Sequence, residues 1–342
     1  MKAVFFEKHG GPEVLKVGEM KDPALGPNDV LVQVKACALN HLDVWARQGL
    51  PGVSIPMPHI PGSDAAGVVL KTGAAVKRFK KDERVVISPG QAPLEAPEAV
   101  AGRDSYSPHF QILGLQTQGT YAQKAAVHER FVIPVSGRYS FEEWASIPLA
   151  SLTAYHMLVT RANVQPGEKV LIHAAGSGIG SAAVQIAKFL GAVVFTTVGS
   201  SKKVLPAKKL GADQVILYRE KDFAEEAKKL TGGRGVDVVF EHVGPDTWPK
   251  NLACLARGGR MAVCGATSGP KAEVDIRALF AKQISILGCY MGSLAELHRV
   301  LELVETGSLK PTIDKIFPLK EAAAAHRRME SRRNFGKIVL KV

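Results

Sequence analysis

Residues 173–192 read HAAGSGIGSAAVQIAKFLGA and carry the strongest structural signal in this 342-residue chain. They follow one apolar run, KVLI at 169–172, and precede another, VVFTTV at 193–198. Glycines in such a turn let the backbone approach a pyrophosphate, whose charge then lies on free N–H groups at the N-terminus of the next helix. The order of strand, turn, helix and strand therefore predicts a dinucleotide site. Its turn comprises Gly176, Ser177, Gly178, Ile179 and Gly180.

The rest of the chain divides into two patterns. After about residue 150, further apolar runs alternate with helical patterns and predict a parallel, doubly wound α/β sheet whose strands are buried on both faces. These runs are QVILY (214–218), VDVVFEHV (236–243), GRMAVCG (259–265) and ISILGCY (284–290). Earlier runs are short, alternate in polarity and are broken by Gly and Pro, which predicts antiparallel β structure. We therefore expect a catalytic domain at 1–150, completed by 291–342, and a cofactor domain at 151–290.

Composition excludes several classes of protein. The formal net charge is +12, but the basic residues are spread along the chain without interleaved aromatics, so nucleic-acid binding is not favoured. No run of 18 apolar residues and no signal sequence is present, which predicts a cytoplasmic protein without a membrane partner. Four scattered cysteines predict free thiols, with Cys37 in a strand core. Lysine-rich helices and loop prolines fit a thermophilic source.

The end of the second strand of the α/β sheet favours NADP(H) over NAD. NAD-binding proteins usually place a carboxylate there to hold the ribose 2′-hydroxyl. This chain reads TTVGSSKK at 196–203 and offers Ser200, Ser201, Lys202 and Lys203 instead, hydroxyls and cations suited to a 2′-phosphate. A structural interpretation, in which a serine caps the next helix and the lysines are solvated, is compatible with phosphate binding.

Four further motifs, taken in order, resemble the medium-chain dehydrogenase/reductase superfamily. They are CALNHLD (37–43), HIPGSDAAGVV (59–69), TGGRGVDVVFEHVG (231–244) and FGKIVL (335–340). The sequence is most similar to the quinone oxidoreductase-like branch and to alcohol dehydrogenase-like proteins. The resemblance implies a GroES-like β-barrel catalytic domain beside a Rossmann domain, with the nicotinamide in the cleft between them. It also implies a homodimer or homotetramer formed through the last Rossmann strand, here ISILGCY.

The positions that carry a catalytic zinc in other members of this superfamily lack its ligands. Those enzymes begin the site with Cys-x-Thr/Ser-Asp, where this chain has Asn40, His41, Leu42 and Asp43. The second ligand comes from Gly-His-Glu, here Gly62-Ser63-Asp64, and the third would lie near Leu149 and Ala150. Because a catalytic zinc needs three protein ligands, we predict no metal. The alternative is an improvised site made from His41, Asp43, His59 and Asp64.

Without a metal, hydrogen-bond donors must stabilise the negative charge on a substrate oxygen, which favours quinones, activated enones and ketones. Asn40 is the best candidate donor, and the matching asparagine is typical of the zinc-free branch. Asp43 could orient Asn40 or His41, or pair with Arg47. Trp45 would form an apolar wall, and the proton would come from His41, Tyr106 or water.

The resemblance places the remaining cofactor contacts. Thr153 would touch the nicotinamide region, and Tyr218 would pack beside the 2′-phosphate. Val243 and Gly244 would lie along the adenosine side of the cofactor. Gly265, Ala266 and Thr267 would line the pyrophosphate or the nicotinamide ribose, and Lys337 would approach the phosphates. Two rival functions stay open. One is an alcohol dehydrogenase or ketone reductase with a residual or non-standard zinc site, and the other is a low-activity NADPH-binding sensor.

Overall fold

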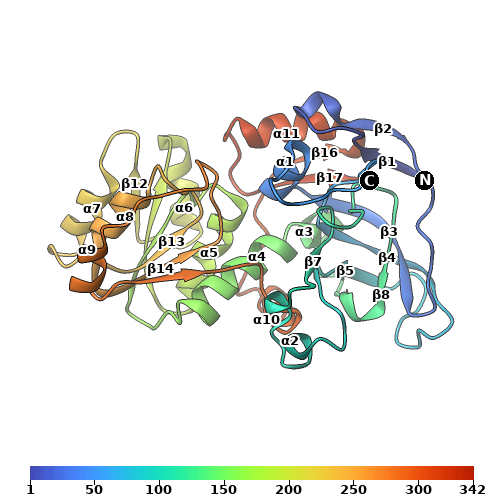
Figure 1. Cartoon of the computed structure of the whole chain (residues 1–342), viewed down its shortest axis with the longest axis horizontal. Helices are drawn as coiled ribbons and strands as arrows, with labels where there is room; N and C mark the ends of the chain where they lie inside the picture. The colour runs from blue at the N-terminus through green and yellow to red at the C-terminus, as the bar shows by residue number, and fades with distance from the viewer. The chain divides into compact units, whose positions relative to one another are not determined.

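The computed structural model describes all 342 residues, which divide into two compact units (Figure 1). The first unit comprises Met1–Leu152, Ser293–Gly307 and Pro311–Val342, and the second comprises Thr153–Gly292 with Ser308–Lys310. The C-terminal segment thus returns to the unit that contains the N-terminus. No helix is long and apolar enough to cross a membrane.

The first unit is built on a seven-stranded, largely antiparallel sheet. Its strands run in the order β16-β17-β3-β4-β5-β9, and β8 also pairs with β3. Every pair is antiparallel except β16 with β17. The strands are β3 (Asp29–Ala38), β4 (Asp64–Thr72), β5 (Arg84–Ile87), β8 (Lys124–His128), β9 (Val132–Pro134), β16 (Ile313–Pro318) and β17 (Lys337–Lys341). The antiparallel β structure expected from the alternating runs is confirmed.

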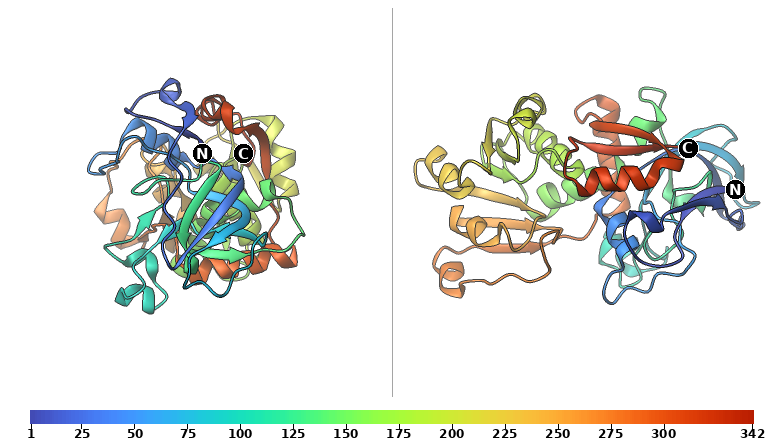
Figure 2. Two further views of the ribbon diagram at one scale, coloured as in Figure 1. Left: turned by 90° about the vertical axis from the view of Figure 1, so that its right-hand side faces the viewer. Right: turned by 90° about the horizontal axis from the view of Figure 1, so that it is seen from above.

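The last strand, β17, brings the C-terminus beside the early part of the chain. It pairs with the end of β3, with Leu340 opposite Cys37 and Val339 opposite Ala38. Figure 2 shows these red and blue segments side by side. Cys37 is fully buried in this core, and all four cysteines are free thiols. The pairing places Lys337, the first residue of β17, near the point where β3 ends and the next helix begins.

Helices and short strands surround this sheet. They are β1 (Lys2–Phe5), β2 (Lys16–Glu19), β6 (Gly90–Gln91), β7 (Gln111–Ile112), α1 (His41–Gln48), α2 (Pro97–Val100), α3 (Phe141–Ala145), α10 (Leu294–Thr306) and α11 (Ala322–Glu330). Asn40 has extended backbone and is the N-cap of α1, and Gly49 ends the helix with a φ of 91°. Because β3 runs directly into α1 through Leu39 and Asn40, the polar groups of α1 begin at the C-terminal end of β3.

The second unit is a six-stranded parallel sheet in the order β12-β11-β10-β13-β14-β15. In chain order this is 3-2-1-4-5-6, the order of a doubly wound dinucleotide-binding sheet. The strands are β10 (Lys169–Ile172), β11 (Val193–Val198), β12 (Gln214–Leu217), β13 (Val236–Glu241), β14 (Leu255–Val263) and β15 (Ser285–Gly288). Its helices are α5 (Gly178–Phe189), α6 (Val204–Lys209), α7 (Phe223–Leu230), α8 (Trp248–Cys254) and α9 (Ile276–Ala281). The predicted α/β class is confirmed.

One detail of that prediction is wrong, because not all strands of the parallel sheet are buried on both faces. The inner strands β10 and β13 are, but β15 is largely exposed within the chain. Strand β15 is an edge strand with a neighbour on one side only, so its apolar residues lack cover that the inner strands have. Ile286 in β15 keeps 36% of its surface exposed. The apolar character of the run indicated a strand but not its position in the sheet.

Candidate active site

Asn40 lies at the centre of a buried polar cluster in the first unit. Only 6% of its surface is exposed. Its side-chain nitrogen Nδ2 donates to Oδ2 of Asp64 at 2.9 Å, and its oxygen Oδ1 accepts from the Lys337 ammonium at 2.6 Å. The same ammonium lies 2.9 Å from Asp64 Oδ2, so the three side chains contact one another in a closed triad. The triad joins the start of α1, the start of β4 and the start of β17.

The partners of Asn40 fix the orientation of its amide. An ammonium can only donate and a carboxylate can only accept, so Oδ1 must face Lys337 and the NH2 group must face Asp64. Of the two hydrogens on Nδ2, one points to Asp64. The second hydrogen remains available to an acceptor other than Asp64. The triad therefore holds a preoriented N–H donor.

Asp64 is completely buried and balanced by donors. Its second oxygen, Oδ1, accepts the backbone N–H of Leu149 at 2.7 Å. Leu149 lies near the position of the third zinc ligand in related enzymes, and it contributes only a backbone donor to Asp64. The ion pair with Lys337 compensates the charge that burial of a carboxylate would otherwise leave uncompensated.

Asp43 accepts a hydrogen bond from the backbone of Asn40 and does not pair with Arg47. Its Oδ2 accepts the backbone N–H of Asn40 at 2.8 Å and the hydroxyl of Tyr121 at 2.9 Å. Burial raises the pKa of the Asp43 carboxyl to about 7, although both hydrogen bonds favour its ionised form. The alternative that Asp43 pairs with Arg47 is wrong, because the Arg47 guanidinium pairs with Glu330. Both side chains therefore bind residues distant in sequence, Asp43 to Tyr121 and Arg47 to Glu330, although they lie one helical turn apart.

The side chains predicted to deliver a proton, His41 and Tyr106, are more exposed than Asn40, whereas His59 of the alternative metal site is buried. His41 is exposed at the start of α1, and its ring centroid lies 5.0 Å from that of Trp45 in an edge-on contact. Tyr106 is half exposed at the end of a short helical turn, Asp104–Tyr106. His59 is buried, and its Nε2 lies 3.0 Å from the carbonyl oxygen of Gly114. No group of three or more His, Cys, Asp or Glu side chains gathers closely enough to hold a metal ion.

In the second unit, the glycine-rich turn has the close approach that a pyrophosphate site requires. Ser177 caps α5 by accepting the backbone N–H of Gly180 at 2.9 Å. A Cβ on Gly180 would lie 2.2 Å from the carbonyl oxygen of Ala174, so only glycine fits there. The helix α5 is 12 residues long and begins at Gly178, so the N–H groups of Gly178 and Ile179, which precede the capped Gly180, have no acceptor within the helix and can bind an anion. The turn therefore fits a dinucleotide.

The end of β11 carries the residues expected at a 2′-phosphate. Ser200 is the N-cap of the turn Ser201–Lys203, but its side chain makes no capping hydrogen bond. Lys203 is half-buried in this turn. Tyr218 follows β12, and its hydroxyl would lie 2.8 Å from a Cβ on Gly199, which places it beside the end of β11. Ser200, Lys203 and Tyr218, which the sequence predicted at one phosphate site, thus all lie at or beside the end of β11.

The loops after β13 and β14 also lie together. Thr267 Oγ1 is 3.3 Å from the carbonyl oxygen of Val243, and a Cβ on Gly265 would lie 2.9 Å from that of His242. The backbone N–H groups of Val243 and Gly244 donate to the Glu241 carboxylate. Thr153 is buried in this unit, with its hydroxyl 4.0 Å from the sulfur of Met291.

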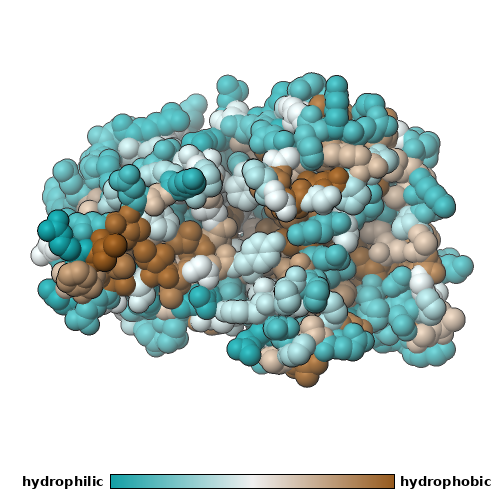
Figure 3. Space-filling model, viewed as in Figure 1, coloured by the Kyte–Doolittle hydropathy of each residue, from teal (hydrophilic) through white to brown (hydrophobic).

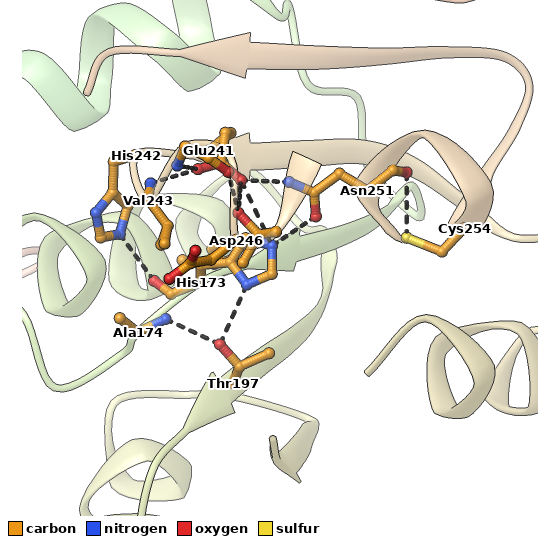
Figure 4. Close-up of polar contacts among 12 residues, drawn as sticks. His173, Ala174, Thr197, Glu241, His242, Val243, Asp246, Asn251 and Cys254 are labelled. Carbon is orange, nitrogen blue, oxygen red and sulfur yellow. Dashed lines mark hydrogen bonds and ion pairs between the residues drawn. The ribbon is translucent and has the colours of Figure 1, made fainter. Parts of the chain in front are cut away.

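Sequence reasoning missed the polar cluster that supports these loops. Figure 4 shows His173, Glu241 and Asn251 meeting at the ends of the central strands. A signal was present, because Glu241 and His173 are polar residues at the ends of the otherwise apolar runs VDVVFEHV and KVLIHAA. Asn251 gave no signal, since it lies in a helix separated from His173 by 78 residues.

Comparison with known proteins defines the family. Residues 26–137 match the model of the alcohol dehydrogenase GroES-like domain, and residues 178–306 match that of the zinc-binding dehydrogenase domain. Quinone oxidoreductase 1 of Escherichia coli (strain K12) is 37% identical over 98% of this chain and 98% of its own length. The chain belongs to the medium-chain dehydrogenase/reductase superfamily, with a GroES-like domain and a Rossmann-like sheet, and it is an oxidoreductase of that superfamily.

Two solved structures extend this comparison. An NAD-dependent alcohol dehydrogenase is 44% identical, with a TM-score of 0.97 and complete coverage of both chains. A 2-octenoyl-CoA carboxylase reductase, solved with NADP and 2-octenoyl-CoA, is 29% identical with a TM-score of 0.92, covering 99% of this chain and 87% of its own. Relatives of this chain therefore use nicotinamide cofactors.

Proposed function

We propose that this chain transfers hydride between NADP(H) and a quinone, an activated enone or a ketone, without a catalytic zinc. The observation that supports it is the triad of Asn40, Asp64 and Lys337, in which a buried ammonium lies among the groups that occupy the zinc-ligand positions of related enzymes. The relatedness to quinone oxidoreductase 1 agrees with this substrate class.

The residues at those positions do not fit a zinc ion. Zinc in proteins is bound by cysteine, histidine and carboxylate side chains, with three protein ligands in a catalytic site. Here Asn40 and Leu149 offer no such side chain, and the one carboxylate, Asp64, is already paired with a cation. A divalent ion beside the Lys337 ammonium would meet strong repulsion in a buried, low-dielectric environment. We therefore derive the chemistry from hydrogen-bond donors alone.

In this proposal Asn40 is the donor that stabilises developing charge. When bound, the nicotinamide supplies or accepts the hydride. The second N–H of Asn40 donates to the substrate oxygen as that oxygen becomes negative, and a fixed donor costs no reorganisation at that moment. Lys337 and Asp64 hold the amide in place. A single amide donor is weaker than a Lewis acid, so the proposal favours substrates that accept hydride readily.

The cofactor specificity is proposed as NADP(H) with NAD as the alternative. The support for NADP(H) is the absence of a carboxylate at the end of β11 and the presence there of Ser200, Lys203 and Tyr218. The support for the alternative is the 44% identical structure, which is an NAD-dependent alcohol dehydrogenase. That relative likewise supports alcohol or ketone chemistry as a second candidate reaction. A cofactor-binding sensor with little turnover is a third.

We also propose how the two units share this function and how copies of the chain assemble. Residues 1–150 with 291–342 would form the substrate domain, and residues 151–290 the cofactor domain. Copies of the chain would form a homodimer or a homotetramer through the exposed edge of β15. Exposed apolar residues lie on α9, on β15 and just after β15, namely Ile276, Phe280, Ile286 and Tyr290. Figure 3 shows hydrophobic residues gathered over the region where Figure 1 draws α9 and β14.

The test is turnover after exhaustive dialysis against a chelator. NADPH and NADH are each offered with a quinone and with an aromatic ketone, before and after dialysis. We expect NADPH oxidation with the quinone at an unchanged rate, and a smaller rate with NADH. Activity that disappears on dialysis and returns with zinc would overturn the metal-free mechanism. Binding of NADPH without turnover on any acceptor would favour the sensor.

A further inference from the structure

A continuous chain of hydrogen bonds crosses the second unit at the carboxyl ends of its central strands (Figure 4). It begins at the backbone N–H of Ala174, which donates to Thr197 Oγ1 at 3.0 Å. Thr197 Oγ1 lies 3.2 Å from Nδ1 of His173, and Nε2 of His173 lies 2.7 Å from Oδ1 of Asn251. The Asn251 amide nitrogen then donates to Glu241. Every side chain of this group is at least 98% buried.

The partners at the two ends give the chain one direction. The Glu241 carboxylate only accepts, so Asn251 must turn its NH2 group towards Glu241 and its oxygen towards His173. His173 must then carry its hydrogen on Nε2 and accept on Nδ1 from the Thr197 hydroxyl. A neutral imidazole satisfies both contacts, and burial lowers the pKa of His173 in the same sense. The tautomer of His173 is thus set by Glu241, through Asn251.

The two ends of this hydrogen-bond chain lie beside the two loops assigned to the cofactor. Ala174 directly precedes the glycine-rich turn and has a φ of 51°, a left-handed conformation that non-glycine residues rarely adopt. Its N–H is held by Thr197. At the other end, Glu241 accepts the backbone N–H groups of both Val243 and Gly244, the latter at 2.7 Å. The chain therefore ties the strained entry of the pyrophosphate turn to the loop after β13.

We propose that His173, Asn251 and Glu241 act together as positioning residues for the nicotinamide cofactor. They contact one another and the loop backbones, and they set the spacing between the glycine-rich turn and the Val243–Gly244 loop. This inference rests on the proposed function, because it assumes that both loops bind the dinucleotide. It extends that function by assigning a role to Asn251, which belongs to no cofactor motif.

Two nearly isosteric substitutions test whether the hydrogen-bond chain positions the cofactor. Thr197→Val removes the hydroxyl that holds Ala174 and His173. Asn251→Asp replaces a permanent donor by a carboxyl that donates to Glu241 only when it is protonated. The other titratable groups facing the chain are His242, whose Nε2 lies 3.0 Å from the carbonyl oxygen of His173, and Cys264, whose N–H donates to the backbone of Glu241. Both are unchanged in these variants.

The readout is the dissociation constant of NADPH and of NADH from the full-length protein between pH 6 and pH 9, with melting temperature and quinone KM alongside. We expect Thr197→Val to weaken cofactor binding roughly tenfold, the equivalent of about one buried hydrogen bond, with quinone KM little changed. Asn251→Asp should bind nearly as wild type at pH 6 and progressively more weakly towards pH 9, because two adjacent carboxylates then repel each other.

Glu168→Gln provides the matched control. Glu168 is a carboxylate of the same unit, paired with Arg260 and placed just before β10, so its loss should lower stability without changing cofactor affinity. The contrary result is that Thr197→Val and Asn251→Asp both lower the melting temperature as this control does but keep wild-type dissociation constants at every pH. That result overturns the positioning role and leaves the proposed function standing. If wild-type protein binds neither nucleotide, the proposed function fails and this inference fails with it.

Discussion

The ammonium nitrogen of Lys337 lies 2.9 Å from Oδ2 of Asp64, with 4% and 0% of the two side chains exposed. The pair joins the last strand of the chain to the start of β4, across 273 residues of sequence. Because both charges are buried, each is tolerated only in the presence of the other. Asn40 bridges them, so the ion pair also orients the amide on which the proposed chemistry depends.

Lys337→Met should destabilise the first unit strongly. Methionine is close to lysine in volume but leaves the Asp64 carboxylate buried and unpaired, which costs about 3–5 kcal/mol of the free energy of unfolding. Urea unfolding of the variant and of the wild type measures this difference in the free energy of unfolding. Lys341→Met is the control, because Lys341 lies on the same strand with its side chain 68% exposed, and its loss should change stability by less than about 1 kcal/mol. Equal losses in both variants would contradict the role of the buried pair.

Asp43 should make stability depend on pH. Its folded pKa of about 7 is raised above the unfolded value, so the stabilisation it contributes is complete below pH 4 and is lost as pH rises through 7. Between pH 5 and pH 8 this amounts to about 2–3 kcal/mol.

The matching variant for this prediction is Asp43→Asn. Its amide oxygen can still accept from Asn40 and Tyr121, but the side chain no longer titrates. Subtracting the unfolding curves of the two proteins at each pH isolates the contribution of Asp43 from that of the buried histidines. A difference that stays constant from pH 5 to pH 8 would show that the Asp43 carboxyl does not titrate in this range.

Much of the fold was predictable because it depends on local pattern. The glycine-rich turn, its cap at Ser177 and the β10–α5–β11 order follow from residues within about 30 positions of one another. The burial of β15 was mispredicted for a physical reason, since an apolar run does not reveal whether its strand has a second neighbour. Edge position is a property of the assembled sheet.

The candidate site was predictable only in part. Asn40 and Asp43 were found because they lie in one motif, and Asp64 because it lies in the stretch Gly62-Ser63-Asp64, which matches the source of the second zinc ligand in related enzymes. The contact of Lys337 with Asn40 depends on β17 pairing with β3, which no local pattern encodes. The sequence suggested a phosphate partner for Lys337, whereas in the structure its ammonium is bound to Asp64 and Asn40. A pairing of Asp43 with Arg47 was one alternative that proximity in sequence offered, but Arg47 pairs with Glu330 in α11 instead.

Lys203→Ala should discriminate against NADPH. If Lys203 contacts the 2′-phosphate, its loss should raise the dissociation constant of NADPH about three- to tenfold and leave that of NADH unchanged, with the effect shrinking at high salt. Lys209→Ala removes an equally basic but exposed residue at the end of α6 and serves as the control. Equal weakening of NADPH and NADH binding would contradict the assignment.

Phe280→Glu should disrupt the proposed dimer. Phe280 on α9 is 68% exposed, and a carboxylate there could not be buried in an apolar interface. Light scattering should show the mass of the wild-type oligomer falling by at least half. Leu205→Glu, at a similarly exposed apolar residue on α6, should leave the mass unchanged. A wild-type protein that is already a monomer would rule out the interface.

The most direct test of the proposed mechanism is the single-turnover rate of hydride transfer in Asn40→Ala, measured with a quinone on chelator-treated protein saturated with NADPH. Loss of one preoriented donor to a developing oxyanion typically costs a factor of about 10²–10³. We predict a fall of roughly that size with the NADPH dissociation constant unchanged. A rate equal to that of wild type would show that Asn40 does not stabilise the transition state, and the triad with Asp64 and Lys337 would be a structural feature only.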